Sequence, residues 1–297
     1  MTTETTIKNP VEFSGVGLHS GVEVALRIAP ARAGTGIVFF RTDLEGFTIP
    51  ARGKYIARVS YATSLMRQGV LLSTTEHLLS TLYSLGIDNA RIDIDNLEVP
   101  ILDGSALPFV KLLDEAGVKQ LGKPRSHLRI RKPVEVVEGA KRISLEPSDA
   151  FEIVCETHYP HPLVGQERLE LTVTPARYAR EIAPARTFGF EQDLDRMRDM
   201  GLIRGASLDN AVCFGPDEIL NPSGLRFPDE CCRHKVLDLI GDLALLGRPL
   251  LGRVVAQRAG HAMHTALVNR VLNDPDCYEL VTSDQLGTHE AAEVAVG

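Results

Sequence analysis

The hydrophobic positions of residues 229–247, DECCRHKVLDLIGDLALLG, recur with the period of an α-helix. Asp229 can cap the start of this helix, and Gly247, followed by Arg248 and Pro249, is a stop signal. One face of the helix is apolar and is expected to pack toward a core. That face consists of Val236, Leu237, Ile240, Leu243 and Ala244.

A polar stripe runs along the same predicted helix. His234, Asp238 and Asp242 stand four residues apart, slightly more than one helical turn, so their side chains share one side of the helix. Burying a histidine and two carboxylates is costly unless something compensates them, and a metal ion plus a hydrogen-bonded partner would do so. For one His-x-x-x-Asp motif alone, a solvated helix face is the simpler interpretation, so other segments must decide.

Strand-like and helical patterns alternate through the first half of the chain. A helix with a leucine stripe is predicted from about Thr74 to Leu85, and Ser73, Thr74 or Thr75 can cap it. Apolar and charged residues alternate over 90–95, which predicts a half-buried strand. Further strands are expected at VEVALRIA, GIVFFRTD and the region around YIARVSYATSLM, and a second helix at about Leu107 to Ala116.

The polar stretch LGKPRSH, residues 121–127, is the best linker candidate because it contains Gly and Pro. Beyond it, strands are expected at HLRIRKPVEVVE, KRISLEP, FEIVCETHY and near LLGRVVAQRAG, and a helix near residues 191–200. Residues 283–297 are polar and Ala-rich, and are expected to be frayed.

The two Leu-rich helices share a plan. EHLLSTLYSLG and RHKVLDLIGDLALLG each place a histidine in an early turn, stop at Leu-Gly and precede a strand. If two similar αβ units pack face to face, His77 and His234 come to one interface.

The composition fits a globular protein, with 44% hydrophobic residues in 297, enough for two domains. The net charge of −7 gives no strong attraction to phosphate and argues against nucleic acid as a partner. Five cysteines without a C-x-x-C pair fit a reducing compartment. Neither a signal peptide nor an apolar run of membrane-spanning length is found, so we expect a cytosolic protein, with peripheral membrane contact left open. A monomer is a separate expectation.

Glu76 and His77 form the second chemical feature. A histidine that holds a metal beside a carboxylate that accepts a proton from the activated water is an economical hydrolase arrangement. A Glu-His pair near a helix N-terminus is otherwise common, with the Glu as a partner of the helix dipole. Together His77, His234 and Asp238 provide two imidazoles and one carboxylate, which suits catalytic Zn²⁺ and also non-haem Fe²⁺.

Three further positions complete the candidate site. His261 follows a predicted strand and can act as a general acid, with Asp242 bonded to it to favour its protonated form; a surface turn is the alternative. His264 has no obvious partner. Thr187 can place a hydroxyl near a developing oxyanion, although an ordinary strand explains its surroundings too. Lys235 is either a charge for the substrate or a solvated side chain.

Seven segments resemble, in order, the zinc-dependent UDP-3-O-acyl-N-acetylglucosamine deacetylase family of lipid A biosynthesis. Together they run across nearly the whole chain. They are GVGLHSG, STTEHLLSTLYSLGIDNA, VPILDGSA, ARTFGF, SLDNAV, RHKVLDLIGDLALLG and AGHA.

The resemblance implies an α+β fold of two similar ββααβ-type domains, with helices packed between two sheets and a groove between the domains. The first domain would span residues 1–123 and carry Glu76 and His77. The second would span residues 127–297 and carry His234, Asp238 and His261. An insert near residues 191–214 would form a hydrophobic passage for the acyl chain.

The resemblance also implies a role for each site residue. His77, His234 and Asp238 match the zinc ligands, and Glu76 matches the general base. The other matches are His261 as general acid, Asp242 as the residue that orients it, Thr187 as oxyanion hydroxyl and Lys235 as a substrate-contacting lysine. Substrate-binding candidates are Leu18, Tyr159, Phe188, Leu194, Ile203, Ala206, Leu208 and Arg258.

The chain departs from the family pattern at three positions. His158 stands where an acidic residue is common, although Tyr159 next to it could still stack on uracil. His264 replaces an Asn, and Arg258 replaces a Lys but can still pair with a phosphate.

These observations lead to the hypothesis of a metal-dependent deacetylase that acts on the N-acetyl group of UDP-3-O-acyl-N-acetylglucosamine, with Zn²⁺, or alternatively Fe²⁺, as cofactor. A non-haem iron(II) oxygenase on the same three ligands is one alternative. A non-catalytic metal-containing binding protein is another, but a structural site would normally fill four positions with protein ligands.

Overall fold

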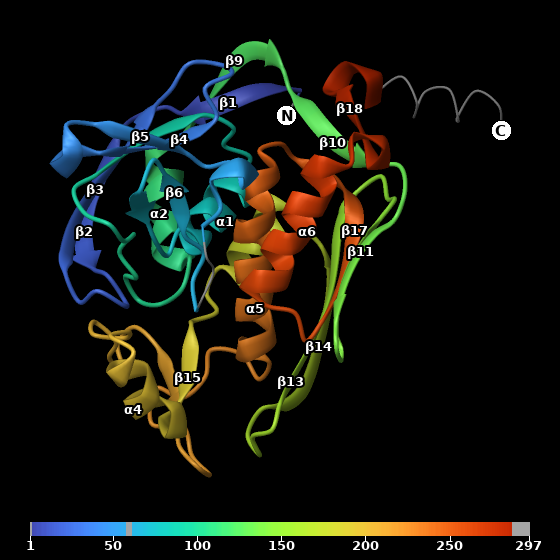
Figure 1. Cartoon of the computed structure of the whole chain (residues 1–297). Coiled ribbons are helices and arrows are strands. Elements are labelled where there is room, and N and C mark those ends of the chain that lie inside the picture. Colours follow the sequence, from blue (N-terminus) through green and yellow to red (C-terminus); the bar gives the residue numbers. More distant parts are fainter. Residues whose placement is uncertain (1, 58–60, 287–297) are drawn as a thin grey trace.

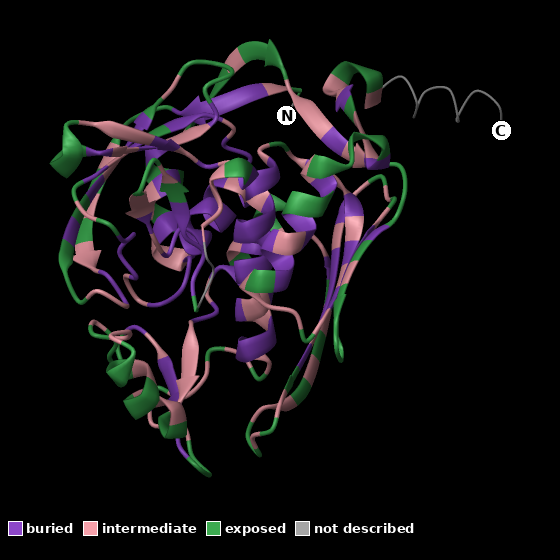
Figure 2. Ribbon diagram, viewed as in Figure 1, coloured by how far each residue is buried: buried purple, intermediate pink, exposed green. Residues whose placement is uncertain are grey.

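Two β-sheets enclose a layer of helices, which is the predicted α+β sandwich (Figure 1). The protein is described here by a computed structural model that covers residues 2–57 and 61–286. The first half of the chain builds one sheet and the second half builds the other. The helices between them are buried along most of their length (Figure 2).

The sheet of the first half has five strands in the order β2-β3-β8-β4-β5. Its central strand β8 pairs antiparallel with β3 and parallel with β4. The predicted alternation in β8 is confirmed, because Ala90, Ile92 and Ile94 are buried while Arg91 is exposed. The strands are β2 (Val11–Val16), β3 (Glu23–Pro30), β4 (Ile37–Arg41), β5 (Phe47–Pro50) and β8 (Ala90–Ile94).

The sheet of the second half has seven strands around β17. β17 pairs antiparallel with β12 and parallel with both β10 and β13, and its Val254 and Ala256 face the core. The strands are β10 (Ser126–Ile130), β11 (Val134–Glu138), β12 (Lys141–Glu146), β13 (Phe151–Tyr159), β14 (Gly165–Thr172), β17 (Leu250–Gln257) and β18 (Tyr278–Thr282).

Three two-stranded sheets complete the β-structure: β1 with β9, β6 with β7, and β15 with β16. Residues 121–127, predicted as a polar linker, are extended strand rather than irregular chain, because β9 pairs with β1 and β10 pairs with β18. The strands are β1 (Thr3–Ile7), β6 (Leu65–Arg67), β7 (Val70–Leu72), β9 (Val118–Pro124), β15 (Phe188–Phe190) and β16 (Val212–Phe214).

The helix layer is organised around α5, which packs on α1 and on α6. Gly241 permits the close approach of α5 to α1, since a Cβ atom there would lie 2.1 Å from the backbone oxygen of Glu76. The helices are α1 (Glu76–Ser84), α2 (Leu107–Ala116), α3 (Pro175–Arg177), α4 (Glu191–Asp199), α5 (Glu230–Leu243) and α6 (His261–Asn273). Short helical turns lie at η1 (Thr42–Leu44), η2 (Gly53–Tyr55), η3 (Tyr178–Ile182), η4 (Ala244–Leu246) and η5 (Pro275–Cys277).

Gly247 ends the helical segment, as predicted, in a left-handed conformation, but the N-terminal ends of α1 and α5 depart from the predicted caps. Asp229 makes no capping bond to α5 and instead accepts from the Arg233 guanidinium at 2.6 Å. The hydroxyls of Thr74 and Thr75 likewise bond to Glu98 and to the Thr63 carbonyl rather than to the start of α1. Asp229 therefore bonds to a side chain of its own helix, whereas the two threonine hydroxyls bond to other segments.

Two further expectations need correction. Residues 55–66 are not one strand, because η2 ends at Tyr55 and β6 begins only at Leu65; residues 58–60 lie outside the described residues. The long helix α6, which begins at His261, was not predicted at all. In the C-terminal stretch expected to be frayed, residues 283–286 instead form a helical turn, and the Ser283 N–H donates to the Arg125 carbonyl at 3.0 Å; the remainder lies outside the described residues. Within the described residues, none of the helices has the length and apolar character needed to cross a membrane.

Candidate metal and catalytic site

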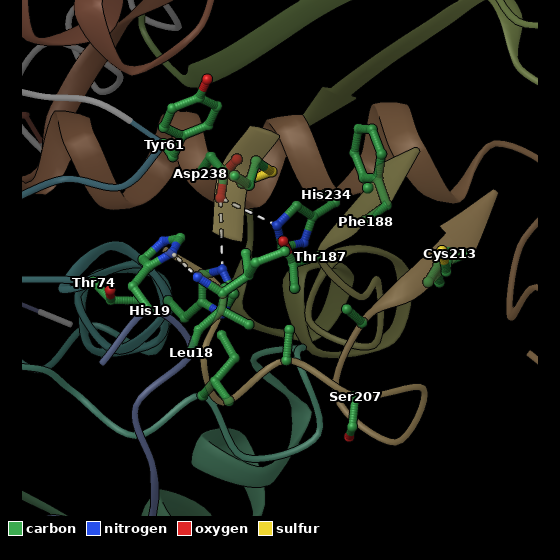
Figure 3. A pocket seen from close by; sticks show the side chains of 18 of the residues that line it. Leu18, His19, Tyr61, Thr74, Thr187, Phe188, Ser207, Cys213, His234 and Asp238 are labelled. Atoms are coloured by element: carbon green, nitrogen blue, oxygen red, sulfur yellow. Dashed lines mark hydrogen bonds and ion pairs between the residues drawn. The ribbon is translucent and has the colours of Figure 1, made fainter. Parts of the chain in front are cut away.

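The two Leu-rich helices α1 and α5 bring His77 and His234 together, as their shared plan predicted. The centroids of the two imidazole rings are 4.9 Å apart. Asp238, one turn along α5 from His234, places Oδ1 3.4 Å from His234 Nε2 and 3.7 Å from His77 Nε2. Figure 3 shows His234 and Asp238 turned toward each other, with the interaction drawn as a dashed line. All three side chains are buried.

The donor set fits a metal ion. The three ligand atoms lie within 4.8 Å of one another, but the two imidazole–carboxylate distances are too long for normal hydrogen bonds. His234 Nδ1 donates to the Ala185 carbonyl at 3.1 Å, which leaves the lone pair of Nε2 directed at Asp238. Burial lowers the pKa of His234 to about 3, so this imidazole is neutral and able to bind a cation.

A second cluster of His and Asp side chains is a hydrogen-bonded group rather than a metal site. Asp242 Oδ2 lies 2.8 Å from Nδ1 of both His261 and His264, so these atoms already bond to one another. The expectation that His264 has no partner is therefore wrong. Its partner comes from another helix, 22 positions earlier in the chain, and sequence proximity gave no indication of it.

Glu76 lies at the start of α1, beside the three side chains that could hold a metal ion. Its Oε2 accepts from the Thr63 backbone N–H at 3.0 Å, and its Oε1 is 3.9 Å from His261 Nε2. Burial raises the pKa of Glu76 to about 7, although the neighbouring His261 and His77 act to lower it. A carboxyl whose pKa lies near neutrality is suited to accept a proton in catalysis.

At His261 the neighbouring charges, rather than burial, determine the direction in which the pKa shifts. Burial acts to lower its pKa, but the carboxylates of Asp242 and Asp238 outweigh burial and raise that pKa to about 9. The imidazole is therefore protonated at neutral pH and directs Nε2 toward the space between Glu76 and Asp238. The predicted bond between Asp242 and His261 is confirmed by the 2.8 Å contact.

Lys235 is not solvated but bonds to Asp238, one of the three side chains that could hold a metal ion. Its Nζ donates to Asp238 Oδ2 at 2.8 Å and lies 5.5 Å from the centroid of the Phe188 ring. Burial acts to lower the pKa of Lys235, but the charge of Asp238 prevails and raises it. Because Lys235 bonds to Oδ2 of Asp238, it is Oδ1 of Asp238 that faces His77 and His234.

Thr187 lies just before β15, in a loop that is held by a buried ion pair between Arg186 and Glu230. Its N–H donates to the Gly104 carbonyl at 2.8 Å, and its own carbonyl accepts from Val212 at 2.8 Å. The preceding Arg186 makes a bidentate pair with Glu230, with Nε and Nη2 at 2.8 and 3.1 Å from its oxygens. These contacts fix the backbone that carries the Thr187 hydroxyl.

The site opens into a cavity of about 330 Å³, and Figure 3 shows side chains from several segments turned into it. Glu76, His77, His234, Asp238 and His261 line one part of it. The α4–β16 insert contributes a largely apolar wall. The wall includes four of the predicted passage residues, Leu194, Ile203, Ala206 and Leu208, and it continues into Leu18, Thr187 and Phe188.

Comparison with known proteins places the chain in a family. The model of the UDP-3-O-acyl N-acetylglycosamine deacetylase family matches residues 4–273. The chain belongs to this deacetylase family. A protein from Solibacter usitatus named UDP-3-O-acyl-N-acetylglucosamine deacetylase is 66% identical over 96% of each chain. Proteins of the same name from Myxococcus xanthus and Phenylobacterium zucineum are 48% and 44% identical, over 93% of this chain and 88% and 96% of theirs.

Two of the substrate-binding candidates do not line the cavity of this deacetylase-family chain. Tyr159 packs its ring 5.4 Å from that of Phe188, at the border of the site. Arg258 lines a separate depression on the surface together with His158 and Gln257. Tyr159 is therefore next to the cavity, whereas Arg258 is apart from it.

Several cavity residues of this family member were not predicted. Tyr61, Met197 and Cys213 line the wall, and Glu98 accepts from the backbone N–H groups of His19 and Ser20 at 2.9 and 2.8 Å. Glu98 thereby holds the GVGLHSG turn beside the site. In the sequence, Glu98 stands out only as an acid beside the apolar residues 99–102. That pattern does not indicate which backbone groups Glu98 binds.

Proposed function

We propose that this chain hydrolyses the N-acetyl group of UDP-3-O-acyl-N-acetylglucosamine, a step of lipid A biosynthesis, and releases UDP-3-O-acyl-glucosamine and acetate. Its family and the names of its relatives support this substrate. The observation that carries the proposal is the meeting of Glu76 and His261 beside the three metal-ligand side chains, with Glu76 Oε1 and His261 Nε2 3.9 Å apart.

We propose that His77, His234 and Asp238 hold Zn²⁺. When bound there, the cation would supply a Lewis acid that polarises the acetyl carbonyl and makes water a better nucleophile. Two imidazoles and a carboxylate also suit Fe²⁺, but the oxygenase and binding-protein alternatives leave the Glu76–His261 pair without a role.

The proposed proton transfers use residues on both sides of the reacting amide. Glu76 accepts a proton from the water whose oxygen attacks the acetyl carbon. The C–N bond then breaks, and His261 Nε2 donates its proton to the departing nitrogen. The products are acetate and a free amine, so one water is consumed. Asp242 stabilises the protonated imidazole through the bond to Nδ1.

Thr187 and Lys235 would complete the polar contacts. The Thr187 hydroxyl is proposed to donate to the carbonyl oxygen as negative charge develops on it, and the backbone bonds of Thr187 to Gly104 and Val212 support this role. Lys235 stays an ammonium because of Asp238 and is proposed to contact the substrate near Phe188.

The rest of the substrate would follow the shape of the cavity. We propose that the 3-O-acyl chain enters the apolar wall formed by Leu18, Leu194, Ile203, Ala206 and Leu208. Tyr159 and Arg258 are proposed for the nucleotide end, with Tyr159 beside Phe188 and able to stack on uracil. The cytosolic location, the monomeric state, the two domain boundaries and peripheral membrane contact stay predictions.

Acetate release by the purified, zinc-loaded protein tests the proposed function. We expect turnover of UDP-3-O-acyl-N-acetylglucosamine, and at least ~100-fold lower kcat/KM for the analogue without the acyl chain. Burying about four CH₂ groups of that chain already accounts for this factor. A folded, zinc-loaded protein that releases no acetate from the acylated substrate would rule the function out. Equal turnover of both substrates would rule out the passage.

A further inference from the structure

Thr63 is a fully buried residue that lies between the proposed base and the partner of the proposed acid. Its relative exposure is 0%, and it lies on the segment that leads into β6. All three of its polar groups have partners. The N–H donates to Glu76 Oε2 at 3.0 Å, the hydroxyl donates to Asp242 Oδ1, and the carbonyl accepts from the N–H and hydroxyl of Thr75.

The hydroxyl of Thr63 completes the shell of donors around Asp242. Oδ2 of this carboxylate accepts from His261 and His264, both at 2.8 Å. Among the described residues, only Thr63 donates to Oδ1. With donors on both oxygens, the carboxylate plane is fixed, and so is the direction in which it holds the His261 ring.

The same hydroxyl also lies 3.1 Å from His261 Nδ1. A hydroxyl can donate one hydrogen bond, and Thr63 donates it to Asp242. The Thr63 hydroxyl oxygen therefore acts as an acceptor for the Nδ1–H of His261. The imidazole N–H is thus shared between Asp242 and Thr63. Rotation of the ring away from the reacting nitrogen would break both contacts.

We propose that Thr63 is a positioning residue that joins the base and acid arms of the site, an inference that rests on the proposed function above. Its backbone N–H holds Glu76, and its hydroxyl orients His261 both directly and through Asp242. Thr63 touches neither substrate nor metal in this account. It acts by holding two proton-transfer groups in one geometry, which is the requirement for their cooperation in a single reaction.

The variant Thr63→Val tests the hydroxyl, because valine has nearly the same shape and keeps the backbone N–H. We expect kcat to fall about 10- to 100-fold, the size of a lost hydrogen bond to a charged group, with KM and zinc content unchanged. Thr63→Ser should recover most of kcat. Thr6→Val is the matched control, because Thr6 is also buried but lies in β1, where its hydroxyl accepts from the Ala31 N–H.

A double variant separates positioning from general destabilisation. In a His261→Ala background, Thr63→Val should cause no further loss of kcat, because its effect acts through the ring that is gone. Thr63→Ala is measured in the same way if the valine variant does not fold. Unchanged kcat, a loss confined to KM, failure of serine to recover activity, or an additive loss in the His261→Ala background would each overturn the inference. Absence of turnover in the wild-type protein would instead refute the proposed function.

Discussion

Replacing Glu76 with glutamine is expected to lower kcat by about 10²–10⁴, the usual contribution of a general base. Glutamine keeps the size of the side chain and can still accept from the Thr63 N–H, but it cannot take a proton from water. Burial raises the pKa of Glu76 to about 7, so the native carboxyl is poised for this transfer. Steady-state acetate release, with zinc content measured on the same samples, checks the result.

Glu4→Gln is the matched control for this substitution. Glu4 is also buried, but it bonds to Lys123 and Asn89 in the region of β1, away from the metal-ligand side chains. Its variant should keep the wild-type kcat. A Glu76→Gln protein with full kcat and unchanged zinc content would show that another group is the base.

Replacing His261 with alanine is expected to lower kcat by about 10²–10⁴ as well, because the departing nitrogen then lacks a proton donor. The three metal-ligand side chains remain, so bound zinc should be unchanged. The carboxylates of Asp242 and Asp238 keep this imidazole protonated in the native protein, and its Nε2 points toward Glu76. The same acetate assay measures the loss.

The control here is His127→Ala, since His127 lies in β10 and lines no part of the cavity. That variant should match the wild-type rate. If His261→Ala kept the wild-type kcat, the proposed acid would have to be sought elsewhere, and if it lost zinc together with kcat, the imidazole would be a metal ligand.

The parts of the site that lie within one helix could be predicted from the sequence. A spacing of four residues places His234 and Asp238 on one side of α5, and adjacency places Glu76 beside His77 at the start of α1. The shared plan of the two helices predicted their meeting, and the 4.9 Å separation of the His77 and His234 rings confirms it.

The remaining parts depend on contacts between distant segments. Thr63 and Asp242 are 179 positions apart, and no periodicity links them. His264 is placed on Asp242 only because α6 packs on α5, and α6 itself was missed in the sequence. The predicted Thr74 cap failed for the same reason, since its hydroxyl bonds to Glu98 rather than to the start of α1.

Acetate release before and after removal of bound metal tests the central claim most directly. Purified protein is stripped with a chelator, and zinc is then returned in measured equivalents while turnover of UDP-3-O-acyl-N-acetylglucosamine is followed. The account predicts that stripping abolishes turnover and that about one Zn²⁺ per chain restores it, as one site of three protein ligands requires. Full turnover by the metal-free protein, or recovery only with Fe²⁺ and O₂, would contradict it.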